Sequence, residues 1–167
     1  MTTQTETGVT TQVYQVFIKA TPEAIWDAIT SPEWTQRYGY RAPAEYDLRP
    51  GGKYRGLATE EMKAGGAGDV LVDGEVIEAD PPHKLVQTWR ALWDPELEAE
   101  GFTRVTWETR EETGGITRLT VTHELEGFPR HAEAVAGDAP LEQGGGGWSW
   151  ILSDLKTLLE SGKPLHG

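Results

Sequence analysis

A long amphipathic helix near the C-terminus, preceded by strand-like segments, most constrains how this chain can fold. Its apolar side chains recur at helical spacing as one stripe: Trp148, Ile151, Leu152, Leu155, Leu158 and Leu159. Gly162 and Lys163-Pro164 then supply helix-stop chemistry. Upstream, residues 47–54 (Asp-Leu-Arg-Pro-Gly-Gly-Lys-Tyr) predict a strand end, a tight turn and a new strand. The simplest way to bury the stripe is one curved antiparallel sheet closed over this helix, an arrangement that usually leaves a cavity.

The middle of the chain predicts six consecutive strands, because segments with alternating apolar residues are separated by turn chemistry. We expect the strands at 44–49, 52–60, 69–79, 83–93, 102–112 and 115–125. Such a series forms an antiparallel meander. Side-chain parity predicts that its inner face carries Leu85, Gln87, Trp89, Val105, Trp107, Leu119, Val121 and His123.

The N-terminal part predicts a strand followed by two short helices. Residues 13–20 alternate as a half-buried strand does, and Thr21 with Pro22 gives a helix N-cap and first helical position. Ser31-Pro32-Glu33 repeats this start chemistry, so the second helix should run through Trp34 to about Tyr38. Residues 1–11 are Thr-rich and polar, and we expect a disordered lead-in before a single domain at 12–163.

The segment 127–147 is polar and Gly-rich, with four successive glycines at 144–147. Glycine opposes helix formation by about 1 kcal/mol per residue, so we expect the firm helix to begin near Trp148. The sequence therefore predicts a loosely packed, mobile edge to the cavity between the last strand and this helix.

Composition excludes several function classes. The 167 residues contain 15 Lys and Arg against 27 Asp and Glu, a formal net charge of -12, which would repel a nucleic-acid backbone. There is no Cys, hence no disulfide or thiolate nucleophile. No apolar run approaches the roughly 20 residues needed to cross a bilayer, and no signal peptide is evident. We expect a cytoplasmic protein with no nucleic-acid partner and no membrane insertion.

Six motifs in order resemble one known family. They are Thr21 to Trp26 before the 31–33 break, Asp47 to Gly52, Gly74-Glu75-Val76 leading to Asp80-Pro81-Pro82, Leu85 to Trp89, Val121-Thr122-His123, and Gly147-Trp148 with the leucines behind it. Together they resemble the heat-shock-protein-90 ATPase activator homologue family of the START-like (SRPBCC) superfamily. The resemblance implies the α+β helix-grip fold, in the order β-α-α-β6-α, with a curved antiparallel sheet around the C-terminal helix. The chain departs from the family pattern at Gln87 and at Gly144 to Gly146.

The resemblance also implies what the cavity holds. Across the superfamily this space takes lipids, sterols, hormones or polyketides, and members range from binders to cyclases and hydrolases. Our leading interpretation is a binder of a small hydrophobic molecule. The alternatives are a cyclase-, hydrolase- or dehydratase-type enzyme working in the same cavity, and a stress-related protein-interaction module in which the cavity is filled.

Aromatic and polar residues with inward parity, or near strand and helix ends, are the candidate ligand contacts. They are Trp34, Tyr38, Tyr54, Gln87, Trp89, Trp93, Trp107, His123, Trp148 and Leu152. For each, ordinary core packing is the competing interpretation, since buried rings fill cores. His123 would be the catalytic base if the protein is an enzyme, and otherwise a hydrogen-bonded core histidine.

Metal and cofactor sites are not expected. His123, Glu124, Glu126, His131 and Glu133 have a spacing that matches no ligand motif, and nothing indicates a cofactor. Trp150 lies on the polar face of the last helix, opposite the apolar stripe. Because exposed aromatic residues are enriched at interfaces, Trp150 is a candidate contact of a homodimer.

Overall fold

The structure is a computed structural model that describes residues 11–165. Of the lead-in predicted at residues 1–11, residues 1–10 lie outside the described part, and Thr11 already belongs to the first strand. The elements follow one another as β1 (Thr11–Ile18), α1 (Pro22–Thr30), α2 (Pro32–Thr35), β2 (Ala44–Tyr46), β3 (Lys53–Leu57), α3 (Glu60–Ala64), β4 (Val70–Asp80), β5 (Lys84–Ala91), α4 (Pro95–Glu100), β6 (Thr103–Glu111), β7 (Thr117–Glu124), α5 (Pro129–Ala136), the 3-10 turn η2 (Leu141–Gln143) and α6 (Gly147–Ser161).

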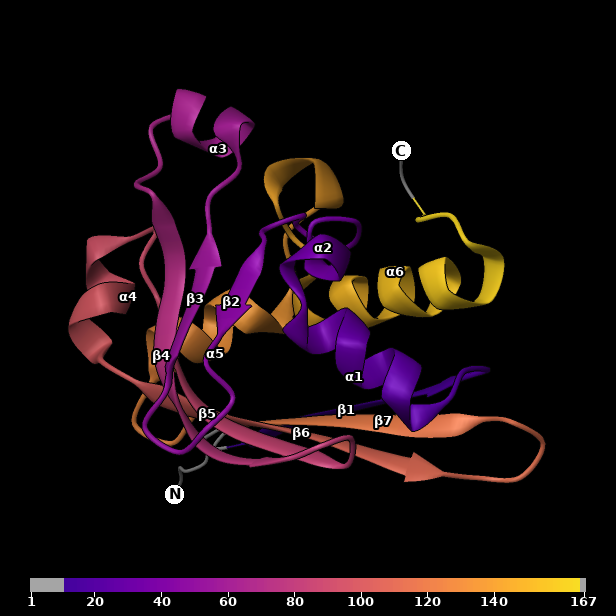
Figure 1. Ribbon diagram of the computed structural model, residues 1–167. Coiled ribbons are helices and arrows are strands. Elements are labelled where there is room, and N and C mark those ends of the chain that lie inside the picture. Colours follow the sequence, from indigo (N-terminus) through magenta and orange to yellow (C-terminus); the bar gives the residue numbers. More distant parts are fainter. Residues whose placement is uncertain (1–10, 166–167) are drawn as a thin grey trace, which may run out of the picture.

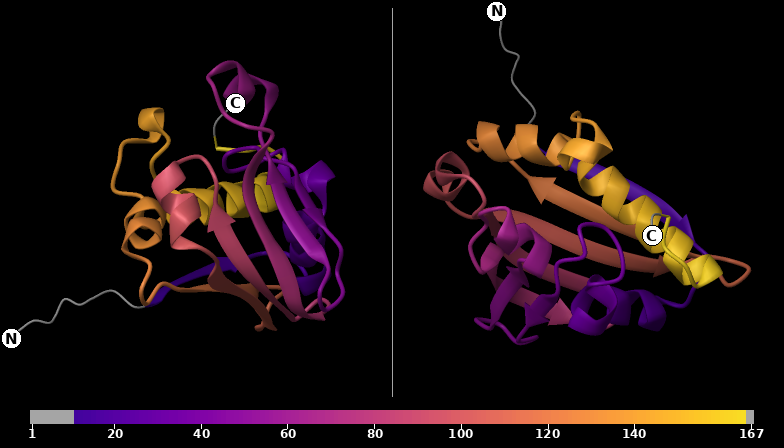
Figure 2. Two further views of the ribbon diagram at one scale, coloured as in Figure 1. Left: turned by 90° about the vertical axis from the view of Figure 1, so that its left-hand side faces the viewer. Right: turned by 90° about the horizontal axis from the view of Figure 1, so that it is seen from above.

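All seven strands form one antiparallel sheet in the order β1-β7-β6-β5-β4-β3-β2. The six predicted strands are the meander β2 to β7, and β1 closes it beside β7. Register shifts at Gly56/Leu57 and at Val76/Glu78 interrupt the ladders on both sides of β4. β2, β3 and β4 curl upward from the rest of the sheet, and α6 lies across the concave side (Figures 1 and 2). The helix-grip fold is therefore confirmed.

The concave face carries the residues that side-chain parity predicted. Leu85, Gln87, Trp89, Val105, Trp107, Leu119, Val121 and His123 are all buried. The α6 stripe packs against this face, with Leu155 and Leu158 almost completely buried. Gly162 ends α6 in the left-handed conformation, as its stop chemistry predicted.

Local capping explains where the first helices begin and end. The Thr21 hydroxyl accepts from the backbone N–H of Ala24 at 3.1 Å, with Pro22 at the first helical position. α2 is shorter than predicted and ends at Thr35 instead of about Tyr38. Gly39 and Arg41 have φ values of +63° and +64°, so the backbone turns through the left-handed region there and continues as a loop to β2.

The structure contains three short helices that the sequence analysis did not predict: α3, α4 and α5. Two carry clear caps, because Thr59 accepts from the N–H of Met62 at 3.1 Å and Asp94 accepts from that of Glu96 at 2.8 Å. α5 occupies part of the segment that we expected to be irregular. These helices are five to eight residues long, too short for a periodic pattern to stand out.

The glycine run before α6 is closely packed, which corrects the prediction of a loose edge. A Cβ on Gly145 would lie 1.7 Å from the carbonyl oxygen of Ala139, and one on Gly147 would lie 2.2 Å from that of Val135. Gly144 and Gly146 have φ values of +82° and +96°. Glycine is needed here for close backbone contact and for left-handed turns.

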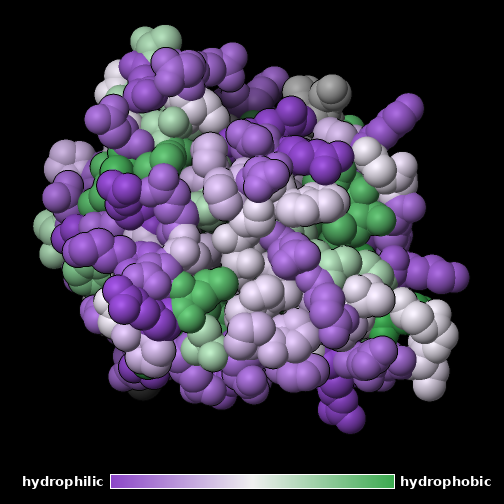
Figure 3. All heavy atoms as spheres, in the orientation of Figure 1, coloured by the Kyte–Doolittle hydropathy of each residue, from purple (hydrophilic) through white to green (hydrophobic). Residues whose placement is uncertain are grey.

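The surface in Figure 3 is dominated by hydrophilic side chains, with hydrophobic ones in small separate groups. Within residues 11–165, none of the helices combines the length and the apolar character needed to cross a membrane.

Candidate functional site: an aromatic cavity under the last helix

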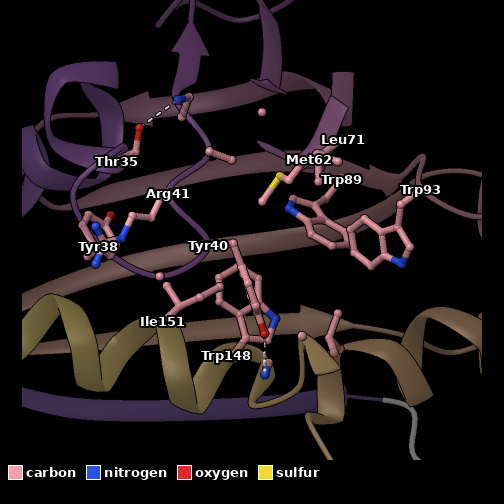
Figure 4. Close-up of a pocket in the computed structure, with 18 of the residues that line it drawn as sticks. Thr35, Tyr38, Tyr40, Arg41, Met62, Leu71, Trp89, Trp93, Trp148 and Ile151 are labelled. Carbon is pink, nitrogen blue, oxygen red and sulfur yellow. Dashed lines mark hydrogen bonds between the residues drawn. The ribbon is translucent and has the colours of Figure 1, made fainter. Parts of the chain in front are cut away.

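A cavity of about 600 Å³ lies between the curled part of the sheet, the start of α6 and the loop from α2 to β2. Eight aromatic residues contribute to its lining: Tyr38, Tyr40, Tyr46, Tyr54, Trp89, Trp93, Trp107 and Trp148. Figure 4 shows Trp89 and Trp93 side by side at one end, with Met62 and Leu71 close to them, and Tyr40 with Trp148 across the space. Among the described lining residues none is Asp or Glu. The size and apolar walls suit a small organic molecule.

Seven of the ten predicted site residues line this cavity: Tyr38, Tyr54, Gln87, Trp89, Trp93, Trp107 and Trp148. Trp93 is 51% exposed and forms part of the mouth, whereas the other six are buried. Trp34, His123 and Leu152 do not line it. Trp34 lies under the Arg37 guanidinium at 4.7 Å. Leu152 is in the core, and its neighbour Ile151 faces the cavity in its place.

His123 belongs to a fixed hydrogen-bonded chain behind the cavity wall. Its Nδ1 accepts from the indole N–H of Trp148 at 3.1 Å, and its Nε2 lies 2.7 Å from the Thr103 hydroxyl, which donates to the carbonyl of Trp89 at 2.5 Å. An indole nitrogen can only donate, so Nδ1 is unprotonated and Nε2 carries the proton. Burial lowers the pKa of His123 to about 3, with a smaller contribution from His131. The geometry is that of a neutral, structural histidine.

Gln87 is fully buried at the floor of the cavity and forms a polar cluster with two aromatic residues. Its Oε1 accepts from the Trp107 indole at 3.2 Å and lies 2.6 Å from the Tyr46 hydroxyl. The Tyr46 ring stacks on Tyr54, with 4.6 Å between centroids. Burial raises the pKa of the hydroxyls of Tyr46 and Tyr54, so both are protonated phenols at neutral pH.

The loop between α2 and β2 forms one wall of the cavity and is tied to α6 by polar contacts. The Tyr40 hydroxyl donates to the carbonyl of Gly145 at 2.7 Å and accepts from the N–H of Gly147 at 3.0 Å (Figure 4). The fully buried Asp154 accepts from the N–H of Gly39 at 2.9 Å and from that of Leu165 at 2.7 Å. Trp150 donates to the carbonyl of Gly39 at 3.3 Å and is half-buried, so it is not the freely exposed ring that we predicted.

Sequence reasoning did not select Tyr46, Met62, Leu71 and Ile151 as site residues. Tyr46 could have been found from strand parity, since Ala44 and Tyr46 share one face of β2. Met62 and Leu71 come from α3 and the start of β4, whose position over the mouth depends on how far the β3–β4 hairpin curls. No local pattern encodes that curl.

A second polar cluster fastens α5 beside the cavity. The Glu100 carboxylate accepts from the backbone N–H groups of Arg130 and His131 at 2.6 and 2.9 Å, and lies 2.7 Å from Nδ1 of His131. Nε2 of His131 accepts from the N–H of Ala91 at 3.0 Å. Burial alone would raise the pKa of Glu100, but these hydrogen bonds lower it below its ordinary value. In residues 11–165 no three His, Asp or Glu side chains are grouped to hold a metal ion.

A curved antiparallel sheet that encloses a ligand-sized space under its C-terminal helix defines the class of helix-grip proteins. Residues 19–160 match the family model described as "Activator of Hsp90 ATPase homolog 1-like protein". The chain therefore belongs to this family. No curated protein matches the sequence significantly.

Solved structures with low sequence identity share the fold. DynU16, a putative protein in the dynemicin biosynthetic locus, has a TM-score of 0.65 at 22% identity, with 94% of this chain and 49% of DynU16 covered. The HSP90 activator PFC0360w from Plasmodium falciparum has a TM-score of 0.56 at 22% identity, with 95% and 92% covered. The Aha1 dimer from Colwellia psychrerythraea has a TM-score of 0.60 at 18% identity, with 93% and 99% covered. The chain spans about half of the length of DynU16.

Proposed function

We propose that this protein binds a small hydrophobic molecule in the cavity between the sheet and α6. The observation that carries the proposal is a space of about 600 Å³ lined mainly by aromatic and aliphatic residues, with Thr35, Arg41 and Gln87 as its polar side chains apart from the tyrosine hydroxyls and indole nitrogens. A space of this size is large enough for a ligand of several fused rings, and natural ligand sites are typically about 300 to 1,000 Å³. A core that only needed to be stable would be filled by side chains, because empty volume costs packing energy.

His123, the residue that we considered as a catalytic base, is not placed to act on a ligand in the cavity. Both ring nitrogens of His123 are engaged by protein groups, and the ring lies outside the cavity lining. A general base needs a free lone pair directed at the substrate. Binding is therefore the function that the site supports best.

Protein partners remain a separate proposal. The family description refers to Hsp90 ATPase activation, and a structure similar to this one is an Aha1 dimer. A homodimer is a prediction that size-exclusion chromatography with light scattering can test. The Trp150 indole N–H already donates to Gly39, so a dimer contact there would use the exposed part of the ring.

The binding proposal can be tested with two matched tryptophan variants. Trp93→Ala removes half-exposed aromatic surface from the cavity mouth, whereas Trp34→Ala removes a comparable ring outside it. A naphthalene-based fluorescent probe should bind the wild type with one site per chain. Its affinity should fall on the order of tenfold in Trp93→Ala, which corresponds to about 1.4 kcal/mol, and stay within twofold in Trp34→Ala.

Native mass spectrometry of protein from its own host would identify an occupant directly. A copurified small-molecule mass that Trp93→Ala loses would support the proposal. Absence of saturable probe binding, with the fold intact by circular dichroism, would contradict it.

A further inference from the structure

The polar groups that line the cavity differ in whether a hydrogen or a lone pair is still free to bind a ligand. The hydrogen bonds that each group makes within the protein show which of these are already used. The indole nitrogen of Trp107 can only donate, so the Gln87 atom that it contacts must be the oxygen, Oε1. That oxygen carries no hydrogen, so Tyr46 must be the donor in its 2.6 Å contact. Both lone-pair directions of Oε1 are thereby used. Gln87 can offer a ligand only its Nε2 hydrogens.

Nε2 of Gln87 is poorly satisfied by the protein. Its one acceptor among the described residues is the carbonyl of Thr88 at 3.5 Å, at the outer limit for a hydrogen bond. An amide nitrogen carries two hydrogens, so at least one has no protein acceptor in the described part of the chain. Gln87 is fully buried, and a buried donor without a partner costs about 1 to 3 kcal/mol. A ligand acceptor at this point would remove that cost.

The tyrosine hydroxyls of the cavity also differ in whether their proton is already donated to a protein group. Tyr38 donates its proton to the carbonyl of Ala28 at 2.7 Å, Tyr40 donates to Gly145, and Tyr46 donates to Gln87. The Tyr54 hydroxyl belongs to the cavity lining, and burial raises its pKa, so it stays protonated at neutral pH. Its own proton has no acceptor among residues 11–165.

Gln87 and Tyr54 belong to one cluster. Tyr46 connects them, because its hydroxyl binds Gln87 and its ring stacks on Tyr54 at 4.6 Å. Both residues line the cavity, and the charged residue of its described lining is the cation Arg41, so an amine would find no counter-charge. Around this point the walls are aromatic rings, which favour flat conjugated ligands over flexible chains.

We propose that the ligand is a flat conjugated ring system bearing a carbonyl-type acceptor, such as an aryl ketone or a quinone. Its oxygen is held by Nε2 of Gln87 and by the hydroxyl of Tyr54. This inference rests on the proposed function and adds the chemical class that the cavity selects. A ligand whose polar end only donates, such as an amine, is disfavoured at this point.

The test uses two probes of nearly equal shape, 2-acetylnaphthalene and 2-isopropylnaphthalene, with the purified full chain. Calorimetry should show that Tyr54→Phe weakens binding of the ketone about two- to tenfold, the range of one net hydrogen bond, and leaves the hydrocarbon within twofold. Tyr14→Phe, on β1 and outside the cavity lining, is the matched control and should change neither. Thermal unfolding verifies that each variant folds.

A second measurement requires no variant. The infrared carbonyl stretch of bound, isotope-labelled 2-acetylnaphthalene should shift to lower wavenumber than in an aprotic solvent, because two donors polarise the bond. If both probes bind but Tyr54→Phe weakens them equally, or if the stretch is unshifted, the acceptor-selective site is wrong while the proposed function stands. If neither probe binds, the proposed function itself fails.

Discussion

The indole N–H of Trp148, at the start of α6, donates to Nδ1 of His123 on β7 across 3.1 Å. The contact links the gripping helix to the sheet through two fully packed rings and fixes the tautomer of the histidine. It also means that the aromatic wall of the cavity depends on a histidine staying neutral.

Protonation of His123 should therefore destabilise the protein in mildly acidic solution. The folded pKa of about 3 is below an unfolded value of about 6.5, so the unfolded state binds more protons. The stabilisation is fully present above pH 6.5 and is lost as pH falls toward 3. We expect urea titrations to show a decrease of about 2 to 3 kcal/mol in the unfolding free energy between pH 7 and pH 4.5. His123→Gln should lack this slope; parallel pH curves for both proteins would contradict the assignment.

Glu100 should act in a different pH window. The pKa of Glu100 is lowered in the folded state. Its contribution to the unfolding free energy is therefore present above the unfolded pKa of about 4.3 and is lost only as pH falls below that value. At pH 7, Glu100→Gln should accelerate hydrogen exchange in α5, because the neutral amide holds the backbone N–H groups of Arg130 and His131 less strongly. The control is Glu98→Gln, which changes an exposed residue of α4, the helix that carries Glu100. Equal exchange in both variants would show that Glu100 does not hold α5.

Much of the scaffold was predictable because it is encoded in local periodicity. The meander, the inward parity of Leu85 to Trp89 and the α6 stripe follow from alternation and helical spacing, and the structure confirms them. The role of Asp154 was not predictable in this way. On a helical wheel it belongs to the polar face with Trp150, and it is buried only because a loop more than a hundred residues earlier folds over it.

The same distinction applies within the site. Parity placed Gln87 and His123 inward, but it could not tell that one would line the cavity while the other would be shielded from it. That difference depends on Trp148 and Trp89, whose rings contact His123 at centroid distances of 5.9 and 5.2 Å. Side-chain packing between distant elements, which has no sequence period, decided the outcome.

The glycines before α6 give a third prediction. Gly145→Ala should cost about 2 to 4 kcal/mol of unfolding free energy, because the new Cβ would overlap the backbone carbonyl of Ala139 and the backbone would have to move. Gly144→Ala meets no atom within 4 Å and should cost only about 1 kcal/mol for its left-handed φ. Chemical denaturation of the two variants checks the order. Equal losses of unfolding free energy in the two variants would mean that the backbone around residue 145 can shift at little cost.

Asp154 gives the fourth prediction. Asp154→Asn retains the shape but leaves one oxygen to accept from two backbone N–H groups, so we expect a loss of about 1 to 3 kcal/mol. The loop that carries Tyr38 and Tyr40 should loosen, and probe affinity should fall with it. Ser153→Ala, exposed on the neighbouring position, is the control. Unchanged amide exchange at Gly39 in Asp154→Asn would contradict this role.

The Asp154 contacts have a practical consequence for anyone who handles this protein. One carboxylate holds Leu165, which follows α6, and Gly39, which lines the cavity. A chain shortened to exclude Leu165 would lose one of the two N–H groups that donate to the buried Asp154. Ligand screens are therefore best run on protein that retains Leu165, because the other residue held by this carboxylate, Gly39, lines the cavity.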